Sequence, residues 1–262
     1  MDKVGIIGAG NIGSAIANGL LKLGDTDSSG LYLSRKRRDL LESQKHSGFN
    51  IADNKTLARE CRVIILAVLP GQAREVVSEI SDELQGGDKI LVSVVAAVTI
   101  SELHHWSGQD VKILRMMPNI ASEYGAGMTC IAGDDEDAVE TIRKLMAPLG
   151  ETLIMKEHLM PAATILAACG IAFFLRYIRA VSQGGIQIGF HADEAGKIAA
   201  QTARGAAEIL LQTGNHPETE IDRVTTPMGC TIAGLNEMEH FGLSSAMIRG
   251  IVKSYSGISD LK

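Results

Sequence analysis

The sequence predicts an α/β fold with a doubly wound, mostly parallel sheet, followed by an all-α region. Through about residue 155, short runs rich in Val and Ile alternate with segments of helical period, as in a parallel sheet covered by helices. Beyond that point the alternation stops and long helical patterns follow. No Pro- or Ser-rich linker separates the two parts. We therefore expect two adjoining domains, residues 1–155 and residues 156–262.

The elements of the first domain follow from apolar runs and stop signals. The expected strands are Lys3–Ile7, Leu31–Ser34, Val63–Val68, Lys89–Val94, Lys112–Met116, Met128–Ala132 and Glu151–Met155. The expected helices are Asn11–Leu23, Arg37–Lys45, Gly71–Leu84, Ile100–Trp106 and Glu136–Met146. Gly24 and Gly48 are suitable helix stops, and Asp134 and Asp135 precede a helix as a cap does.

The second domain reads as helical throughout. The expected helices are His158–Gln183, Ala192–Gln212, Ile232–His240 and Ser244–Ser256. Within the first of them, Ala162–Phe174 is apolar nearly all round, so it needs partners on several sides. A domain of this size obtains them best by pairing with a second copy, and we expect a homodimer.

Composition excludes several classes of partner. The chain has 262 residues, 25 Lys and Arg against 31 Asp and Glu, and only 4% aromatic residues, which argues against nucleic acid. Its N-terminal apolar run is too short for a signal peptide, and no uncharged apolar stretch of about 18 residues follows. We expect a cytoplasmic protein that does not engage a membrane.

The cysteines and histidines indicate neither disulfides nor a metal site. Four cysteines, Cys61, Cys130, Cys169 and Cys230, lie far apart without a CxxC pair, as in reduced cytoplasmic proteins. Neighbouring histidines such as His104 and His105 point to different faces of a helix, so we expect no metal.

The strongest local motif is a GxGxxG that follows the first strand and opens a helix, with glycines at Gly8, Gly10 and Gly13. Gly8 permits the tight turn, Gly10 lets a pyrophosphate approach the backbone, and Gly13 lets helix and strand pack closely. The alternative is a purely structural glycine turn. This context favours a Rossmann domain that binds a dinucleotide.

The end of the second strand indicates which dinucleotide. The residues Ser34, Arg35 and Lys36 stand where an NAD site usually has Asp or Glu, and two more arginines follow before Asp39. Arg35 can stack on adenine and contact a 2′-phosphate, and the hydroxyl of Ser34 can add a hydrogen bond. Alternatively, the later cations only solvate a helix start. We expect NADPH, with NADH possible.

Over some 230 residues, the order of motifs resembles that of the pyrroline-5-carboxylate reductase family. Besides the glycine turn, the resemblance rests on Ala67–Pro70, Ser93–Ala97, Met117–Asn119, Ala199–Thr202, Gly205–Ala207, His216–Pro217 and Val224–Leu235. It implies a Rossmann domain, a helical C-terminal domain that intertwines with its mate in a dimer, and often a higher assembly of dimers. The implied reaction is hydride transfer from NAD(P)H to the C=N carbon of 1-pyrroline-5-carboxylate, a cyclic imine, giving L-proline.

The resemblance also implies where the cofactor binds. The residues implied around the adenosine and phosphates are Gly8, Gly10, Asn11, Ile12, Ser34, Arg35 and Asn54. Those implied at the nicotinamide end are Ala67, Leu69, Ala97 and Asn119. Asn119 has the alternative role of turning the chain after Pro118.

A second candidate site lies in the segment Thr226–Thr231, just before a predicted helix. Its backbone N–H groups can converge on a substrate carboxylate, and Thr231 offers a hydroxyl as the catalytic-site candidate. An ordinary helix cap is the alternative. The substrate-binding candidates are Val224, Thr226, Met228, Gly229, Cys230 and Thr231.

Four departures from the family's usual pattern leave other functions open. The family usually has Lys at Leu69, Gly at Ala97, a Ser-Gly-Ser-Gly-Pro-Ala run at Ala167–Ala172, and Gly-Gly-Thr-Thr at Met228–Thr231. These changes suggest two alternatives: a reductase of a different cyclic imine, and an NADP-binding sensor or scaffold with impaired turnover. A β-hydroxyacid dehydrogenase would instead have a lysine four residues after a glycine pair, where this chain has Phe174.

Overall fold

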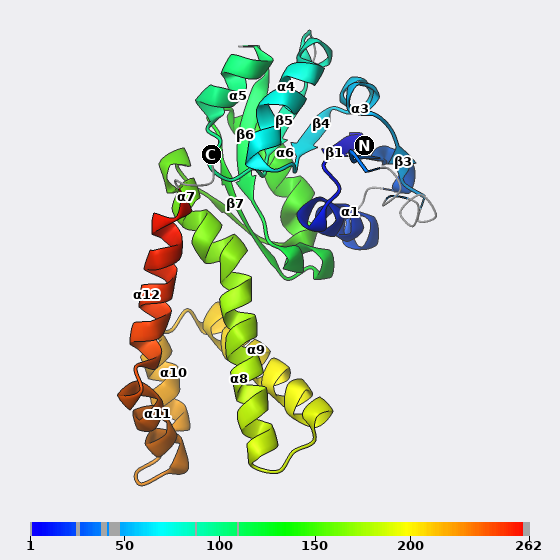
Figure 1. Ribbon diagram of the computed structural model, residues 1–262. Coiled ribbons are helices and arrows are strands. Elements are labelled where there is room, and N and C mark those ends of the chain that lie inside the picture. Colours follow the sequence, from blue (N-terminus) through cyan, green and yellow to red (C-terminus); the bar gives the residue numbers. More distant parts are fainter. Residues whose placement is uncertain are drawn as a thin grey trace. The chain divides into compact units, whose positions relative to one another are not determined.

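A computed structural model describes residues 2–24, 27–37, 41, 48–86, 88–108 and 110–258 (Figure 1). Contacts divide the chain into two compact units, which are described separately. The first unit is Met1–Cys169 with Ser254–Lys262, and the second is Gly170–Lys253.

The first unit is built on one mixed sheet with strand order β3-β2-β1-β4-β5-β6-β7-β8. Its strands are β1 Val4–Ile7, β2 Leu31–Ser34, β3 Asn50–Ile51, β4 Val63–Leu66, β5 Ile90–Ser93, β6 Lys112–Met117, β7 Gly127–Ala132 and β8 Gly150–Ile154. All neighbouring strands are parallel except β6 and β7, which are antiparallel. The strand order reverses at β1, so the predicted doubly wound, mostly parallel sheet is confirmed, with its switch point at β1.

Helices follow most of the strands. They are α1 Asn11–Leu23, α3 Asn54–Glu60, α4 Pro70–Leu84, α5 Ile100–Ser107, α6 Glu136–Met146 and α7 Met160–Ala163. The predicted helix Arg37–Lys45 lies mostly outside the described residues. Asp135 caps α6 by accepting from the backbone N–H of Ala138 at 2.8 Å, as the sequence suggested. Three short elements were not predicted from the sequence: β3 and α3 of this unit, and α10 Pro217–Val224 of the second unit.

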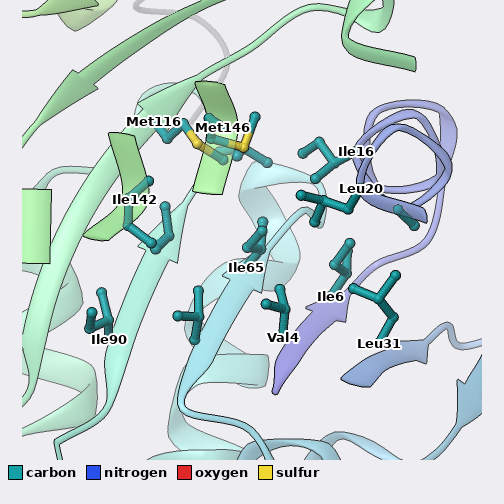
Figure 2. Close-up of a cluster of buried hydrophobic side chains, with 14 of the residues drawn as sticks. Val4, Ile6, Ile16, Leu20, Leu31, Ile65, Ile90, Met116, Ile142 and Met146 are labelled. Atoms are coloured by element: carbon teal, nitrogen blue, oxygen red, sulfur yellow. The ribbon is translucent and has the colours of Figure 1, made fainter. Parts of the chain in front are cut away.

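The two faces of the sheet carry separate apolar layers. On one face, strand residues pack with α1 and α6, and Figure 2 shows Val4, Ile6, Ile16 and Leu20 in this layer. On the other face, α3, α4 and α5 contribute the buried Leu57, Val77, Ile80 and Leu103. Because strands buried on both faces need continuous apolar sequence, the Val- and Ile-rich runs were a reliable strand signal.

The first unit extends beyond the predicted boundary after residue 155. Met160 and Ala163 of α7 pack with Met117 of β6 and with Cys130 and Ala132 of β7. A π-helix, η6 Thr164–Cys169, follows α7 and also contacts these strands. The start of the predicted long helix therefore completes the core of the sheet domain, and the division falls after Cys169.

The second unit is all helical, as predicted. Its helices are α8 Gly170–Gln187, α9 Ala192–Thr213, α10 Pro217–Val224, α11 Cys230–His240 and α12 Leu243–Ser256, the last of which ends in the first unit. Many apolar side chains are exposed in a single chain, among them Phe174, Ile188, Leu211 and Phe241.

One helical segment departs from the expectation that no apolar stretch reaches the length of a membrane span. The helical segment Glu157–Gln187 is long and apolar enough to cross a membrane by length and composition, and 28% of its most apolar window is buried. A core helix of a protein assembly meets the same criterion.

Candidate dinucleotide and substrate sites

The turn after β1 requires glycine at two positions. Gly8 has φ +97°, and a Cβ there would lie 2.4 Å from the carbonyl oxygen of Ala67. A Cβ on Gly13 would lie 2.5 Å from the carbonyl oxygen of Gly8. The backbone N–H groups of Gly8 and Ala9 both donate to the carbonyl oxygen of Ser34, at 2.9 and 3.0 Å. These contacts join the glycine turn to the end of β2.

Gly10 serves a different purpose from its neighbours. It is the N-cap of α1, and a Cβ placed on it would meet nothing within 4 Å. The first turn of α1 has no acidic residue and no side-chain cap, so its backbone N–H groups can receive an anion. The open space beside Gly10 fits the pyrophosphate of a dinucleotide.

The end of β2 presents a hydroxyl and a cation beside this turn. Ser34 is 5% exposed, and its Oγ donates a hydrogen bond to Oδ1 of Asn54, the first residue of α3. Arg35 is half-buried and donates from Nη1 to the carbonyl oxygen of Ala9 at 3.0 Å. Lys36 is exposed. The sheet thus brings Ser34, Arg35 and Asn54 together, whereas Arg38 lies outside the described residues.

The residues predicted for the nicotinamide end follow neighbouring parallel strands. Ala67 and Leu69 follow β4, Ala97 follows β5, and Asn119 follows β6. The carboxyl ends of parallel strands share one edge of a sheet, which is also the edge that carries the glycine turn. Leu69 is 70% exposed there, and Ala97 has φ +60°, a left-handed conformation that favours glycine.

Asn119 makes hydrogen bonds with both ends of its amide. Its Oδ1 accepts from the backbone N–H of Ala121 at 3.1 Å and so caps a short 3-10 helix, Ile120–Tyr124. Its Nδ2 donates to the carbonyl oxygen of Ala167 at 3.1 Å. Asn119 therefore turns the chain after Pro118, and its contact with nicotinamide stays a prediction.

The substrate-site candidates belong to the second unit, whereas the cofactor-site candidates belong to the first. Thr226 to Gly229 form a turn in which the N–H of Gly229 donates to the carbonyl oxygen of Thr226 at 2.9 Å. Met228, at the third position of this turn, has φ +59° and is fully exposed.

The turn leads directly into a helix. Gly229 is the N-cap of α11, so Cys230 and Thr231 lie in the first turn, where backbone N–H groups lack helical partners. Val224 ends α10 just before the turn. The arrangement suits an anion.

The thiols are poor nucleophiles where the structure buries them. Burial raises the pKa of the Cys61 thiol to about 12, and it also raises the pKa of Cys130. Cys169 is exposed in a single chain, and partial desolvation raises the pKa of its thiol. Among the residues that the structure describes, no group of three or more His, Cys, Asp or Glu side chains could hold a metal ion.

The structure places one further residue beside Asn54, a candidate residue for the adenosine ribose. Glu79 of α4 accepts a hydrogen bond from Nδ2 of Asn54 at 2.7 Å. Nothing in the sequence marks it, because it is one of several acids on an exposed helix face.

A glycine turn at the switch point of a doubly wound sheet, an open helix N-terminus and a cationic strand end are the features of a dinucleotide-binding domain. Residues 3–97 match the family model described as "NADP oxidoreductase coenzyme F420-dependent". Residues 157–261 match the model described as "Pyrroline-5-carboxylate reductase dimerisation".

Comparison with whole proteins identifies the family. The chain is 43% identical to pyrroline-5-carboxylate reductase 2 of Dictyostelium discoideum, over 96% of this chain and 90% of that protein. It is 41% identical to pyrroline-5-carboxylate reductase 1 of the same organism, but spans only 48% of that protein's length. The enzyme of Escherichia coli is 30% identical over 96% of this chain and 95% of its own. The chain belongs to the pyrroline-5-carboxylate reductase family.

Solved structures agree with this assignment. The reductase of Streptococcus pyogenes has a TM-score of 0.86 and 26% identity, covering 99% of this chain and 98% of its own. The Plasmodium falciparum reductase, solved with NADP bound, has a TM-score of 0.90 and covers 99% of this chain and 98% of its own, but at 23% identity it shows the fold alone.

Proposed function

We propose that this chain reduces the C=N bond of 1-pyrroline-5-carboxylate to give L-proline, with NADPH as its preferred reductant. The observation that carries the proposal is its 43% identity to a pyrroline-5-carboxylate reductase over 96% of the chain. The glycine turn supports it, because Gly8, Gly10 and Gly13 each meet the requirement of a dinucleotide-binding loop.

We propose that the first unit holds the cofactor at three places. Gly10, Asn11, Ile12 and Gly13 receive the pyrophosphate, because they form the N-cap and the first turn of α1. Ser34 and Asn54 receive the adenosine ribose, and Arg35 contacts its 2′-phosphate. The positions Ala67, Leu69, Ala97 and Asn119 line the nicotinamide end.

When bound, the cofactor supplies a hydride, which is the demanding part of the chemistry. The protein orients the imine and stabilises its positive charge. A protonated cyclic imine accepts a hydride readily, so positioning and electrostatics are the main tasks of the site. In this proposal the first turn of α11 binds the substrate carboxylate, with the Thr231 hydroxyl donating a hydrogen bond to it. Val224, Thr226, Met228, Gly229 and Cys230 surround that position.

We propose that residues 157–261 form a homodimer, which can assemble further. The family model for this region is a dimerisation domain. Exposed apolar side chains on α8 and α9, such as Phe174, Leu175 and Ile198, supply the surface. The apolar segment Glu157–Gln187 then packs within the assembly and does not cross a membrane. We place the enzyme in the cytoplasm.

One observation favours a second candidate, a reductase for a different cyclic imine. Ala97 and Met228 both stand in left-handed conformations at positions where the family usually has glycine, and both lie in proposed ligand loops. A changed loop can change the ring that fits.

The test is steady-state reduction of a panel of cyclic imines, with and without a carboxylate, by NADPH. Fastest turnover of pyrroline-5-carboxylate with formation of proline supports the proposal. A higher kcat/KM for another imine supports the second candidate. Tight binding of NADPH without turnover of any imine would favour the sensor or scaffold and defeat both.

A further inference from the structure

A chain of three side chains runs from α4 to the end of β2. Glu79 accepts from Nδ2 of Asn54, with 2.7 Å between Oε2 and Nδ2. Asn54 in turn accepts through Oδ1 from the hydroxyl of Ser34. Ser34 is 5% exposed, so its hydroxyl has few other partners, while Glu79 is exposed at the outer end of the chain.

The carboxylate fixes the direction of every hydrogen bond in this chain. An ionised Glu only accepts, so it selects the NH₂ end of the Asn54 amide. The oxygen of that amide must then face Ser34, and an amide oxygen also only accepts. The single proton of the Ser34 hydroxyl is therefore committed to Asn54, and its oxygen can offer only a lone pair to any further partner.

A lone pair suits a 2′-hydroxyl better than a 2′-phosphate. The hydroxyl of the adenosine ribose can donate to the oxygen of Ser34, whereas the phosphate is only an acceptor. To donate to a phosphate, Ser34 would leave two oxygens, its own and that of Asn54, facing each other without a proton. That unmade hydrogen bond costs binding free energy.

We propose that Glu79 is a positioning residue that sets cofactor preference. Through Asn54 it holds Ser34 as an acceptor, which favours the 2′-hydroxyl of NADH and reduces the discrimination in favour of NADPH. The negative charge of Glu79 acts in the same direction. Arg35 still supplies a cation for the phosphate, so the enzyme accepts both cofactors. The inference rests on the proposed function in placing the adenosine ribose at Ser34 and Asn54.

The experiment measures binding and needs no turnover. Dissociation constants for NADP⁺ and NAD⁺, and for the fragments 2′,5′-ADP and 5′-AMP, are measured by titration calorimetry on the full-length protein and on Glu79→Gln. A Gln side chain can donate as well as accept, so the Asn54 amide can turn over and free the Ser34 proton. We expect affinity for NADP⁺ relative to NAD⁺ to rise about fivefold, the effect of one hydrogen bond.

Glu75→Gln is the matched control. Glu75 lies one turn earlier on the same exposed face of α4, so this change removes an equal charge without touching Asn54. Its NADP⁺ to NAD⁺ affinity ratio should stay close to that of the parent protein. An equal shift in both variants would show that charge alone acts, and would overturn the proposal.

Ser34→Ala tests the direction of the hydrogen bond. In the parent protein it should weaken NAD⁺ more than NADP⁺, whereas in the Glu79→Gln background it should weaken NADP⁺ more. A greater loss of NADP⁺ in both backgrounds contradicts the proposal, as does failure of both adenosine fragments to bind. Absence of proline formation with intact nucleotide binding would contradict the proposed function and leave these binding comparisons decisive.

Discussion

The side-chain amide of Asn119 donates a hydrogen bond to the carbonyl oxygen of Ala167, with 3.1 Å between Nδ2 and O. Ala167 lies in the π-helix Thr164–Cys169, where the wide turn alters the usual backbone hydrogen bonds. A side chain that enters a helical ladder is a recognised cause of such a distortion. Asn119 thus links the loop after β6 to the irregular helix turn that follows α7.

We predict that Asn119→Ala destabilises the protein by about 2 kcal/mol, because the N–H of Ala121 and the carbonyl oxygen of Ala167 both lose their partner. Urea denaturation measures the change. Asn119→Asp is the comparison: it keeps the acceptor for Ala121 but turns a carboxylate oxygen towards the carbonyl oxygen of Ala167 at a buried position, so it should destabilise the protein as well. Equal stability of Asn119→Ala and the parent protein would show that water replaces both bonds.

We predict that Ala97→Gly stabilises the fold by about 1 kcal/mol, because Ala97 has φ +60° and an L-residue pays a steric cost in that region that glycine does not. Thermal unfolding reports the change. Ala96→Gly is the matched control: Ala96 is not among the described non-glycine residues with positive φ, so glycine there should destabilise instead. A gain in both variants would refute the strain argument.

Met228→Gly should also stabilise the protein by about 1 kcal/mol, since the third position of its turn has φ +59° and its side chain is fully exposed. Met228→Ala removes nearly the same side chain but keeps Cβ, so it should give little gain. Denaturant midpoints of the two variants separate backbone strain from side-chain burial. Equal gains would assign the effect to loss of the exposed methionine.

If Thr231 binds the substrate carboxylate, Thr231→Ala should lower kcat/KM by about tenfold, the expected loss of one hydrogen bond to a charged group. Thr231→Ser keeps the hydroxyl and should retain most activity. NADPH affinity, measured separately, should not change in either variant. Unaltered kinetics in Thr231→Ala would remove this residue from the proposed site.

A surface ion pair on α6 predicts a pH dependence. Arg143 donates to both oxygens of Glu140, at 2.6 and 2.7 Å, and so lowers the pKa of Glu140 from 4.5 to about 2. A carboxyl with a lowered folded-state pKa stabilises the fold above its unfolded value. The stabilising contribution is therefore complete above pH 4.5 and is lost as the pH falls towards about 2.

Urea unfolding of the parent protein and Glu140→Gln across this pH range measures the effect. The parent protein should have a larger free energy of unfolding than Glu140→Gln at neutral pH, and this difference should shrink as the pH falls from 4.5 towards about 2. Arg143→Gln should lose most of this pH dependence, since only Lys144, with 3.5 Å between its Nζ and Oε1 of Glu140, then remains to lower the pKa of Glu140. A difference in the free energy of unfolding that stays constant with pH would mean that the ion pair does not stabilise the protein through ionisation of Glu140.

Much of the sheet domain could be predicted from the sequence. The features that could not be predicted have physical reasons. The strands β1, β4 and β5 are buried on both faces and so carry continuous apolar runs. The strand β3 has two residues, too few to show any period. The antiparallel direction of β7 could not be predicted, because a buried strand has the same apolar sequence in either direction.

Some residues of the candidate site could likewise be predicted from the sequence, and others could not. Glycines 8, 10 and 13 were predictable because each answers a local requirement of the turn. Glu79 was not, because its contact with Asn54 depends on the packing of α3 against α4 and leaves no mark on an exposed helix face. The hydrogen bond between Asn119 and Ala167 joins residues 48 positions apart and needed the fold to be known.

The apolar side chains Phe174, Ile188 and Leu211, exposed in a single chain, link folding to abundance. If two copies bury these faces together, association contributes to the free energy of unfolding, and stability rises with the logarithm of protein concentration. A cell that makes less of this protein would then have fewer molecules and also a smaller fraction of them folded. The number of folded, working molecules in the cell would then fall more steeply than the expression of the gene.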